Sequence, residues 1–513
     1  MTPFGDRAVR FSIPEDRSRR ELFAELSSLP GVADVVLAEE IGCVVFVDAQ
    51  AERSAVSRVL ASRPHDRDRV TSSGEETGAS HVVAVVYDGD DLEAVATTLG
   101  RSKEFVVSLH SEPDYRVAML GFLPGFAYLR DLPRELRLPR RAPRARVPAG
   151  SVAIAAEYTG IYPFASPGGW HLLGRAPTFE PFGPHGAAFA IGDRVRFVPS
   201  SDSPRPKHAP ARPPPPATPH LEIARAAGVA LLVDGGRPGK MHEGVPPGGP
   251  LVRSLLGEAN SRAGNAPLAC AVELSGTLEV VARGGTVVVA DETGRYTLAE
   301  GDRHTLSTAG RTRARYLALE GGIDSPLVLG GRGALLVAGI GALLRKGDLL
   351  VTADRGEGPT AATNGVDGVR SDVDRVHTDV GRVHTDVGRL RTDVDRLRTD
   401  VDARIAIMPG PDASAAVLDE LTTRTFSVST ASDRTGTRLE GALLESLASS
   451  QSGRRRSTPM VIGAIELTPS GLIVLGPDHP TTGGYPVVAV VRDVSLDSFF
   501  ARPIGAPVRF RLG

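Results

Sequence analysis

The sequence is poor in cysteine and tryptophan, has no excess charge of either sign, and each of these features excludes a class of protein. Two cysteines in 513 residues are too few for a disulfide framework or a cysteine zinc site. Cys43 and Cys270 are therefore expected to be small buried apolar residues. The 59 basic residues are balanced by 61 acidic ones, which argues against a nucleic-acid-binding protein.

Long hydrophobic runs are also missing. The longest, ALLVAGIGALL at 334–344, is too short to span a bilayer. The first residues, MTPFGDRAVRF, lack the apolar core of a signal peptide. The sequence therefore predicts a cytoplasmic protein that does not bind a membrane.

The length predicts several domains. Residues 1–80 alternate strand and helix patterns, which indicates a small α/β domain of ferredoxin-like type. Residues 81–202 consist largely of short apolar segments separated by glycine and proline, the pattern of a compact β-barrel. The eight prolines of SPRPKHAPARPPPPATPH make 203–219 an extended linker. Short strands resume over 220–513, so the expected fold class is α+β, mostly β.

A heptad repeat interrupts the second half at 364–403. Segments such as HTDVGRV and RTDVDRL place Val or Leu at alternating spacings of three and four, as in a coiled coil. The Asp, Thr, Gly and Val of the repeat are weak helix formers. A projecting helix and a disordered loop both remain open.

The turn SPGGWHLLGRAP, 166–177, contains the one tryptophan. Gly168 and Gly169 would allow positive φ and let backbone N–H groups approach an anion. Trp170 would supply a flat apolar wall and His171 a titratable group. With Ser166, these residues form the first candidate site, and the alternative is a structural turn capped by a packed indole.

A second candidate is the segment GPDHPTTGGYP, 476–486. It combines a carboxylate, an imidazole, two hydroxyls and an open backbone within seven residues: Asp478, His479, Thr481, Thr482, Gly483 and Gly484. Arg434, in SDRTGTRLEG, would suit a carboxylate or phosphate. Glu273 is a lone carboxylate in an apolar strand, and its alternative is an ordinary solvent-facing position. In DGGRPGKMHEGVPPGGP, 234–250, the polar residues are expected to be satisfied within the turn.

These motifs carry a family resemblance over nearly the whole chain. LGFLPGFAYL, RVPAGSVAIA and TGIYPFASPGGWHLLGR resemble allophanate hydrolase subunit 1, a family that includes the B-type component of 5-oxoprolinase and the kinase inhibitor KipI. GRPGKMHEGVPPGG, LEGGIDSPLVLGGR, SDRTGTRLEG and DHPTTGGYPVVAVV resemble allophanate hydrolase subunit 2, which includes the C-type component of 5-oxoprolinase and KipA. The sequence departs from these families at 156–158, 171, 233 and 248–252.

The resemblance implies a natural fusion of the two components, built from cyclophilin-like β-barrels. It implies ATP-dependent opening of 5-oxo-L-proline to glutamate, with ATP and Mg²⁺ and with a separate LamB/YcsF-type partner, the A-type component. The lactam, or a related small amide, would be activated by phosphorylation. We expect one site shared between the 166–171 and 478–484 turns. In this hypothesis Asp478 and His479 act in metal or acid–base chemistry, His171 and Glu273 are further catalytic candidates, and the hydroxyls, glycines and Arg434 hold phosphate or substrate.

Two alternatives follow from the same resemblance. One is a carboxyltransferase-like component of a urea or amide carboxylase, acting with partners. The chain cannot be a whole urea carboxylase, because none of its four lysines stands in the Met-Lys-Met setting of a biotinyl domain. The other is a non-enzymatic regulator of a histidine kinase. A homo-oligomeric state remains open in each case.

Overall fold

The computed structural model describes residues 1–48, 53–62, 78–183, 186–201, 216, 218–309, 312–353, 404–441 and 456–513. The heptad segment 364–403 lies outside these residues, as does 203–219 except for 216, 218 and 219. Both expectations about them stay predictions. The described chain is mostly β, with few helices and two nearly closed barrel-like sheets, which confirms the expected fold class.

The N-terminal unit is a four-stranded sheet of order β1-β2-β4-β3. β4 lies between β2 and β3 and is antiparallel to both, the split βαβ arrangement of ferredoxin-like folds. The fourth position, however, is filled by the two-residue β1. The elements are β1 (Thr2–Pro3), β2 (Ala8–Ser12), α1 (Arg19–Ser27), β3 (Val32–Leu37), β4 (Ile41–Phe46) and α2 (Ser54–Ala61).

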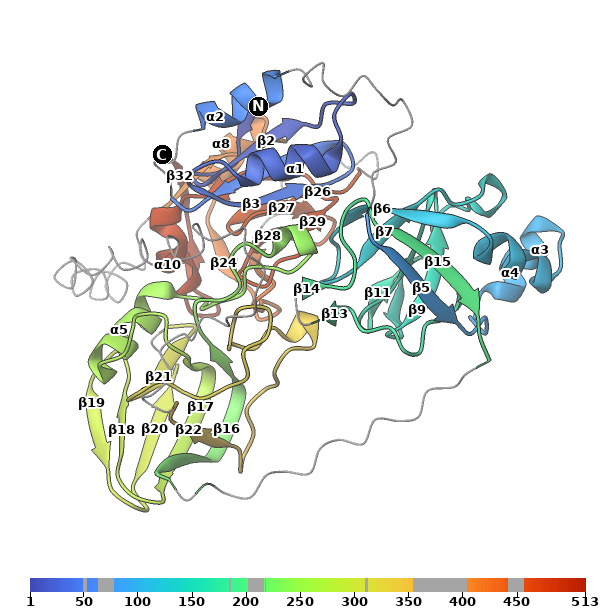
Figure 1. Ribbon diagram of the computed structural model, residues 1–513. Helices are drawn as coiled ribbons and strands as arrows, with labels where there is room; N and C mark the ends of the chain where they lie inside the picture. Colours follow the sequence, from blue (N-terminus) through green and yellow to red (C-terminus); the bar gives the residue numbers. More distant parts are fainter. Residues whose placement is uncertain are drawn as a thin grey trace.

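The next unit is a seven-stranded sheet of order β12-β9-β10-β7-β6-β15-β5, with α3 and α4 beside it (Figure 1). A bridge between Val86, just after β5, and Arg175 of β12 joins its two ends, so the sheet nearly closes into a barrel. The elements are β5 (Ser80–Val85), α3 (Leu92–Leu99), α4 (Lys103–Ser111), β6 (Asp114–Leu120), β7 (Ala127–Arg130), β9 (Ser151–Ala155), β10 (Tyr158–Ile161), β12 (His171–Arg175) and β15 (Arg194–Pro199).

The second half begins with a sheet built on two long strands, β16 (His220–Val233) and β17 (Ala271–Arg283). They pair along their whole length, and Gly228 faces Gly276 with φ of 105° and 132°. A Cβ on Gly276 would lie 2.1 Å from the Ala227 carbonyl oxygen, so this close crossing requires glycine. The other elements are α5 (Arg253–Ala263), β18 (Val287–Ala290), β19 (Arg295–Leu298), β20 (Arg303–Ser307), β21 (Arg315–Leu319) and β22 (Leu349–Val351).

The C-terminal sheet has eight strands in the order β31-β24-β25-β28-β27-β30-β23-β32. Its core merges with that of the preceding sheet, because α5 and the β16–β21 side chains pack against α8, α10 and β30 in one cluster. The elements are β23 (Ile405–Pro409), α8 (Ala415–Thr423), β24 (Phe426–Val428), β25 (Gly436–Glu440), β27 (Ala464–Thr468), β28 (Gly471–Leu475), β30 (Val487–Val491), α10 (Asp493–Phe500), β31 (Pro507–Val508) and β32 (Phe510–Leu512).

The N-terminal sheet packs on this C-terminal sheet, as Figure 1 shows. Phe4, Ala8 and Cys43 share a buried cluster with Met460 and Val490. The two cysteines, Cys43 and Cys270, are free and buried, as expected, and burial raises the pKa of each to about 12. The first and last parts of the chain therefore form one continuous core.

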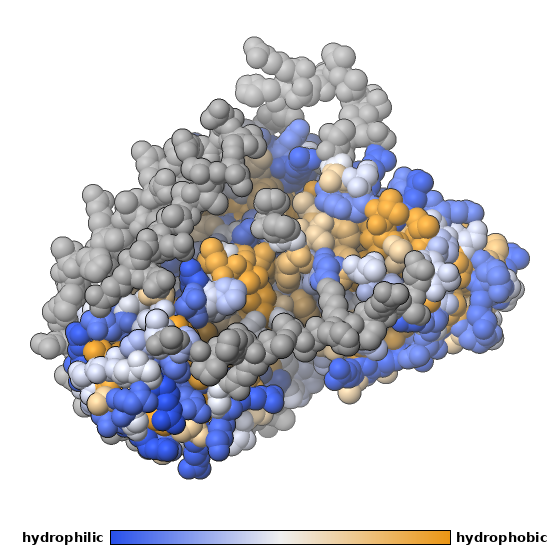
Figure 2. Space-filling view, turned by 60° about the horizontal axis from the view of Figure 1, so that its bottom comes forward, coloured by the Kyte–Doolittle hydropathy of each residue, from blue (hydrophilic) through white to orange (hydrophobic). Residues whose placement is uncertain are grey.

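No helix among the described residues is long and apolar enough to cross a membrane. Figure 2 shows apolar residues gathered in the middle of one face, between two lobes whose outer parts are largely hydrophilic.

Candidate functional site

The turn after β28, Asp478–Gly483, is anchored from behind by a buried ion network. Arg434 donates to both carboxylate oxygens of Asp478, at 2.8 and 2.9 Å, and also to Glu273 and to the Gly249 carbonyl. Glu273 in turn accepts from the Tyr316 hydroxyl at 2.7 Å and from a backbone N–H. Three predicted site residues from distant parts of the second half thus lie in direct contact.

The network leaves its charged groups little freedom to act on a substrate. Burial alone would lower the pKa of Arg434, but Glu273 and Asp478 outweigh it and hold that pKa above its usual value. Asp478 and Glu273 are each 4% exposed. No group of three or more His, Cys, Asp or Glu side chains suited to a metal occurs among the described residues. The geometry favours a positioning role for Asp478, Glu273 and Arg434, and the catalytic and binding roles expected of them stay predictions.

His479 and Thr481 differ from the residues of the ion network, since each has a buried polar atom without a partner among the described residues. His479 is fully buried, and its Nδ1 lies 2.8 Å from the Pro480 carbonyl oxygen, which can only accept. Nδ1 must then carry the proton, so Nε2 presents a lone pair. Among the described residues, neither that Nε2 nor the Thr481 hydroxyl has a hydrogen-bond partner. Burial lowers the pKa of His479 to about 4, so the ring is neutral at pH 7.

Thr482 connects the two halves of the chain. Its Oγ1 accepts from the Phe122 N–H at 3.1 Å, and β29 (Thr482–Gly483) pairs with β26 (Thr458–Pro459). Phe122 has φ of 70°, an unusual value for a residue with a side chain. The contact of the threonine turn in the first half is therefore the loop GFLPGF, and not the turn at 166–171.

The indole turn reaches this contact through a series of aromatic rings packed edge to face. Trp170 is 5% exposed and packs edge-on against Phe126, with ring centroids 5.4 Å apart. Phe126 packs against Phe122 at 5.5 Å, beside Thr482. The alternative of a packed indole thus describes Trp170, which supports the loop that meets the threonine turn.

The glycines of both turns do not form the expected anion cradles. Gly168, Gly169, Gly483 and Gly484 all lack positive φ. A Cβ on Gly168 would lie 2.4 Å from the Tyr162 hydroxyl, so this glycine permits tight packing instead. That part of the prediction was wrong.

The remaining residues of the indole turn lie apart from the threonine turn. His171 begins β12, and its Nε2 lies 2.9 Å from the Pro139 carbonyl oxygen. Ser166, in β11 (Ser166–Gly168), pairs with Val147 and keeps an unpartnered buried hydroxyl. Neither residue lines the cavity described below. A direct role for them in the chemistry stays a prediction.

Sequence reasoning missed Glu466, on β27. This residue is 6% exposed, and its Oε1 lies 2.8 Å from the position of a Cβ on Gly483. Burial raises its pKa to about 7. The signal was a lone acidic residue within the apolar run VIGAIELTPSGLIVLG, the pattern that singled out Glu273.

Glu466→Gln should change the pH dependence of stability. The folded-state pKa, about 7, exceeds the ordinary value of 4.5, so the folded protein retains a proton that the unfolded chain releases. Stability from this group is present below pH 4.5 and is lost as the pH rises to about 7, by about 3 kcal/mol. Denaturant unfolding at several pH values should show that the free energy of unfolding of the variant, relative to that of the wild type, increases over this pH interval. The exposed Glu440→Gln should track the wild type, and parallel curves for Glu466→Gln would contradict the assignment.

The segment Lys240–Gly244 fixes the junction of the three units. The Met241 N–H and the His242 ring both lie within hydrogen-bond distance of Asp34 in the N-terminal sheet, at 2.6 and 3.0 Å. Glu243 accepts from Lys240 and from the Ala187 N–H of the first barrel. These polar side chains have partners, but the partners include residues of other units and not only of the turn, so they hold the N-terminal unit and the first barrel against the second half.

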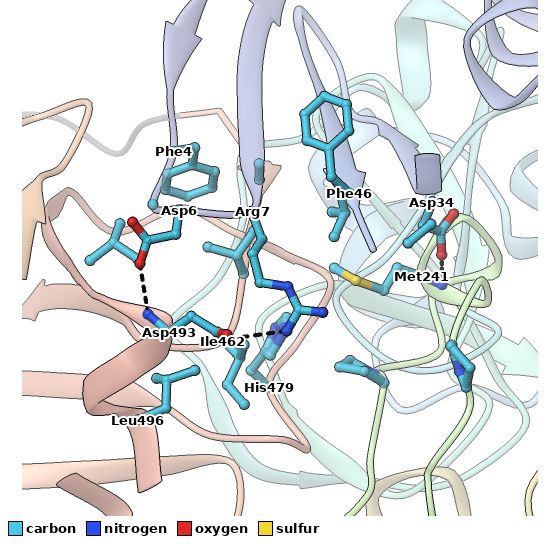
Figure 3. Close-up of a pocket in the computed structure, with 18 of the residues that line it drawn as sticks. Phe4, Asp6, Arg7, Asp34, Phe46, Met241, Ile462, His479, Asp493 and Leu496 are labelled. Carbon is cyan, nitrogen blue, oxygen red and sulfur yellow. Dashed lines mark hydrogen bonds and ion pairs between the residues drawn. The ribbon is translucent and has the colours of Figure 1, made fainter. Parts of the chain in front are cut away.

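A cavity of about 160 Å³ lies beside this segment, between the N-terminal unit and the second half (Figure 3). Phe4, Arg7 and Phe46 reach into it from the N-terminal sheet, and His479, Asp493 and Leu496 lie on the opposite side. Arg253, at the start of α5, also lines it. His479 of the threonine turn thus borders a cavity built from distant parts of the chain.

Comparison with known proteins accounts for both halves. A family model described as "Carboxyltransferase domain, subdomain C and D" matches residues 1–188, and one described as "Carboxyltransferase domain, subdomain A and B" matches residues 243–512. The chain belongs to the carboxyltransferase-domain family. The solved structure of TTHA0988 is 28% identical, with a TM-score of 0.76, over 98% of this chain and all of that one.

The curated relatives divide between the halves of this carboxyltransferase-domain protein. It is 36% identical to the 5-oxoprolinase B-type component of Haemophilus influenzae over 210 residues, which cover 39% of this chain and 96% of the relative. It is 48% identical to the B-type component of Escherichia coli O157:H7 over 126 residues, 23% of this chain but only 58% of the relative. The 5-oxoprolinase C-type component of Escherichia coli K12 is 28% identical over 311 residues, 56% of this chain and 90% of the relative. The protein is thus a fusion of a B-like half and a C-like half.

Proposed function

We propose that this protein is the B+C component of an ATP-dependent 5-oxoprolinase and acts with a separate LamB/YcsF-like partner, the A-type component. The observation that carries the proposal is the contact between Thr482 and Phe122, since it joins the C-like half to the B-like half beside an unpartnered histidine. The similarity of each half to a different 5-oxoprolinase component supports the same substrate class.

The residues predicted to hold ATP and Mg²⁺ do not fit that task. Arg434 is occupied by two carboxylates, Gly168 and Gly483 form no left-handed cradle, and the described residues offer no metal-ligand cluster. The cavity beside His479 is also well below the several hundred Å³ that larger ligands occupy. We therefore assign no step of nucleotide chemistry to these residues.

What the chain can supply is a neutral hydrogen-bond acceptor in a water-poor site. In the proposed reaction the Nε2 of His479 accepts the N–H of the lactam, which increases electron density on the lactam carbonyl oxygen. A more electron-rich oxygen is a better nucleophile, so the amide becomes easier to activate. The low pKa of His479 suits hydrogen-bond acceptance better than storage of a proton.

The family description favours a second candidate, a carboxyltransferase-like step on an amide nitrogen with partner proteins. The same acceptor would orient the amide N–H there, and the biotin nitrogen that loses its carboxyl group would take up the proton of the amide.

The test is a coupled assay of the full chain with an A-type component. We expect 5-oxoproline and ATP to yield glutamate and ADP only when both proteins are present. Carboxylation of urea or a related amide by carboxybiotin, without glutamate formation, would support the second candidate. No turnover of either kind would contradict both enzymatic proposals and favour a KipI/KipA-type regulator of a histidine kinase.

A further inference from the structure

The cavity between the N-terminal unit and the second half is lined by one charged group that has no ion partner among the described residues. Asp6 is bound by Arg492, with the closer oxygen at 3.0 Å, and Arg7 is bound to Asp493 at 3.0 Å. Asp34 accepts from two backbone N–H groups and contacts the His242 ring. The charged side chains Asp6, Arg7, Asp34 and Asp493 are therefore already neutralised or hydrogen-bonded.

Arg253 is different. Its side chain makes no hydrogen bond or ion pair in the described part of the chain, while its backbone N–H, at the start of α5, donates to Asp497 at 2.9 Å. It is an exposed residue that lines the cavity. Loss of hydration and the charge of Arg7 lower the pKa of Arg253, and the charges of Asp493 and Asp497 offset only part of this shift. An anion in the cavity would relieve both effects.

His479 also lines the cavity, and its buried Nε2, which has no partner among the described residues, can accept a hydrogen bond but cannot donate one. Between these polar groups the walls are largely apolar, as Figure 3 shows for Phe4, Phe46, Met241 and Leu496. The space of about 160 Å³ equals the liquid volume of about five water molecules. A matching ligand is a small compact molecule with one anionic group, one N–H donor and an apolar body.

We propose that this cavity binds a small cyclic amide acid of the 5-oxoproline class, with its carboxylate on Arg253 and its amide N–H on His479. The proposal rests on the proposed function for the choice of this class, and it places the substrate against the N-terminal unit, outside the first barrel. The apolar ring carbons would contact Phe4, Phe46 and Leu496.

Binding to the full chain alone tests this assignment without turnover. Calorimetry should detect binding of 5-oxoproline. Two analogues should each bind about ten- to a hundredfold more weakly: 2-pyrrolidinone, which lacks the carboxylate, and N-methyl-5-oxoproline, which lacks the N–H. Arg253→Met should weaken the binding of 5-oxoproline by a similar factor and leave the affinity for 2-pyrrolidinone unchanged. Arg295→Met, which removes an exposed arginine of β19, should bind like the wild type.

The outcomes separate the two proposals. Binding with this pattern but no turnover with an A-type component would support the cavity and contradict the proposed function. Unchanged affinity and KM in Arg253→Met, or undiminished binding of the N-methyl analogue, would overturn the cavity assignment even if glutamate is formed. An absence of 5-oxoproline binding at millimolar concentration would overturn it as well. Thermal unfolding of each variant checks that it is folded.

Discussion

Replacing Arg434 with methionine should destabilise the second half of the protein by about 3–5 kcal/mol. The substitution keeps much of the side-chain volume but leaves Asp478 and Glu273, each 4% exposed, without their shared cation. A buried carboxylate that loses its partner retains the full cost of desolvation. Denaturant unfolding, followed by a probe in the second half, measures the effect.

Arg438→Met is the matched control, because this exposed arginine lies on β25 a few residues away and makes only a 3.4 Å contact with Ser470. It should change the free energy of unfolding by less than about 0.5 kcal/mol. A loss below about 1 kcal/mol in Arg434→Met would show that the network does not anchor the threonine turn. Restoration by the further changes Asp478→Asn and Glu273→Gln would confirm that unpaired charge is the cause.

Gly121→Ala should have the second large effect, at the contact between the halves. A Cβ at this position would lie 2.2 Å from Thr482 Oγ1 and 3.0 Å from Thr482 Cβ, so rotation of the threonine side chain cannot relieve the clash. Gly121 also has φ of 151°, which side chains rarely adopt. We expect a loss of about 2–3 kcal/mol from overpacking and backbone strain, and faster amide hydrogen exchange in 121–126 and 479–483.

Gly100→Ala separates strain from clash. Gly100 caps α3 in the same barrel with φ of 62°, and nothing lies within 4 Å of its Cβ position. The Gly100→Ala variant should lose only about 1 kcal/mol of unfolding free energy, which is the cost of a left-handed backbone for alanine. Combining Gly121→Ala with Thr482→Ala should cost at least about 0.5 kcal/mol less than the sum of the single changes. Strict additivity would show that the two residues do not press on each other.

Local patterns in the sequence were enough to predict the fold class, and they drew attention to two turns as candidate sites. The apolar alternation of the strands predicted a mostly β protein, and the density of polar groups singled out Asp478–Gly484. Glu273 was noticed as a lone carboxylate in an apolar strand, but its burial and its need for a partner were not predicted. What the sequence could not provide was the identity of that partner, because Arg434 lies 161 positions away.

The same limit applies to the contact between the halves. Phe122 and Thr482 are 360 positions apart, and nothing in either motif names the other. Trp170 drew attention by its rarity, yet a buried indole in an aromatic cluster and an indole lining a ligand site have the same local sequence. Arg253 and Glu466 were overlooked, since one arginine at a helix start is ordinary, and burial of a glutamate depends on the strands around it.

The packing of the N-terminal sheet on the C-terminal sheet has a consequence for production of the protein. Phe4, Ala8 and Cys43 would face water if the first half were made alone, and Met460 and Val490 would do so in the isolated second half. Such uncovered apolar surfaces promote aggregation. With both surfaces on one polypeptide, pairing becomes intramolecular and is governed by an effective concentration rather than by expression level. Dilution should then leave the assembled state unchanged, whereas separately synthesised halves would need matched supply.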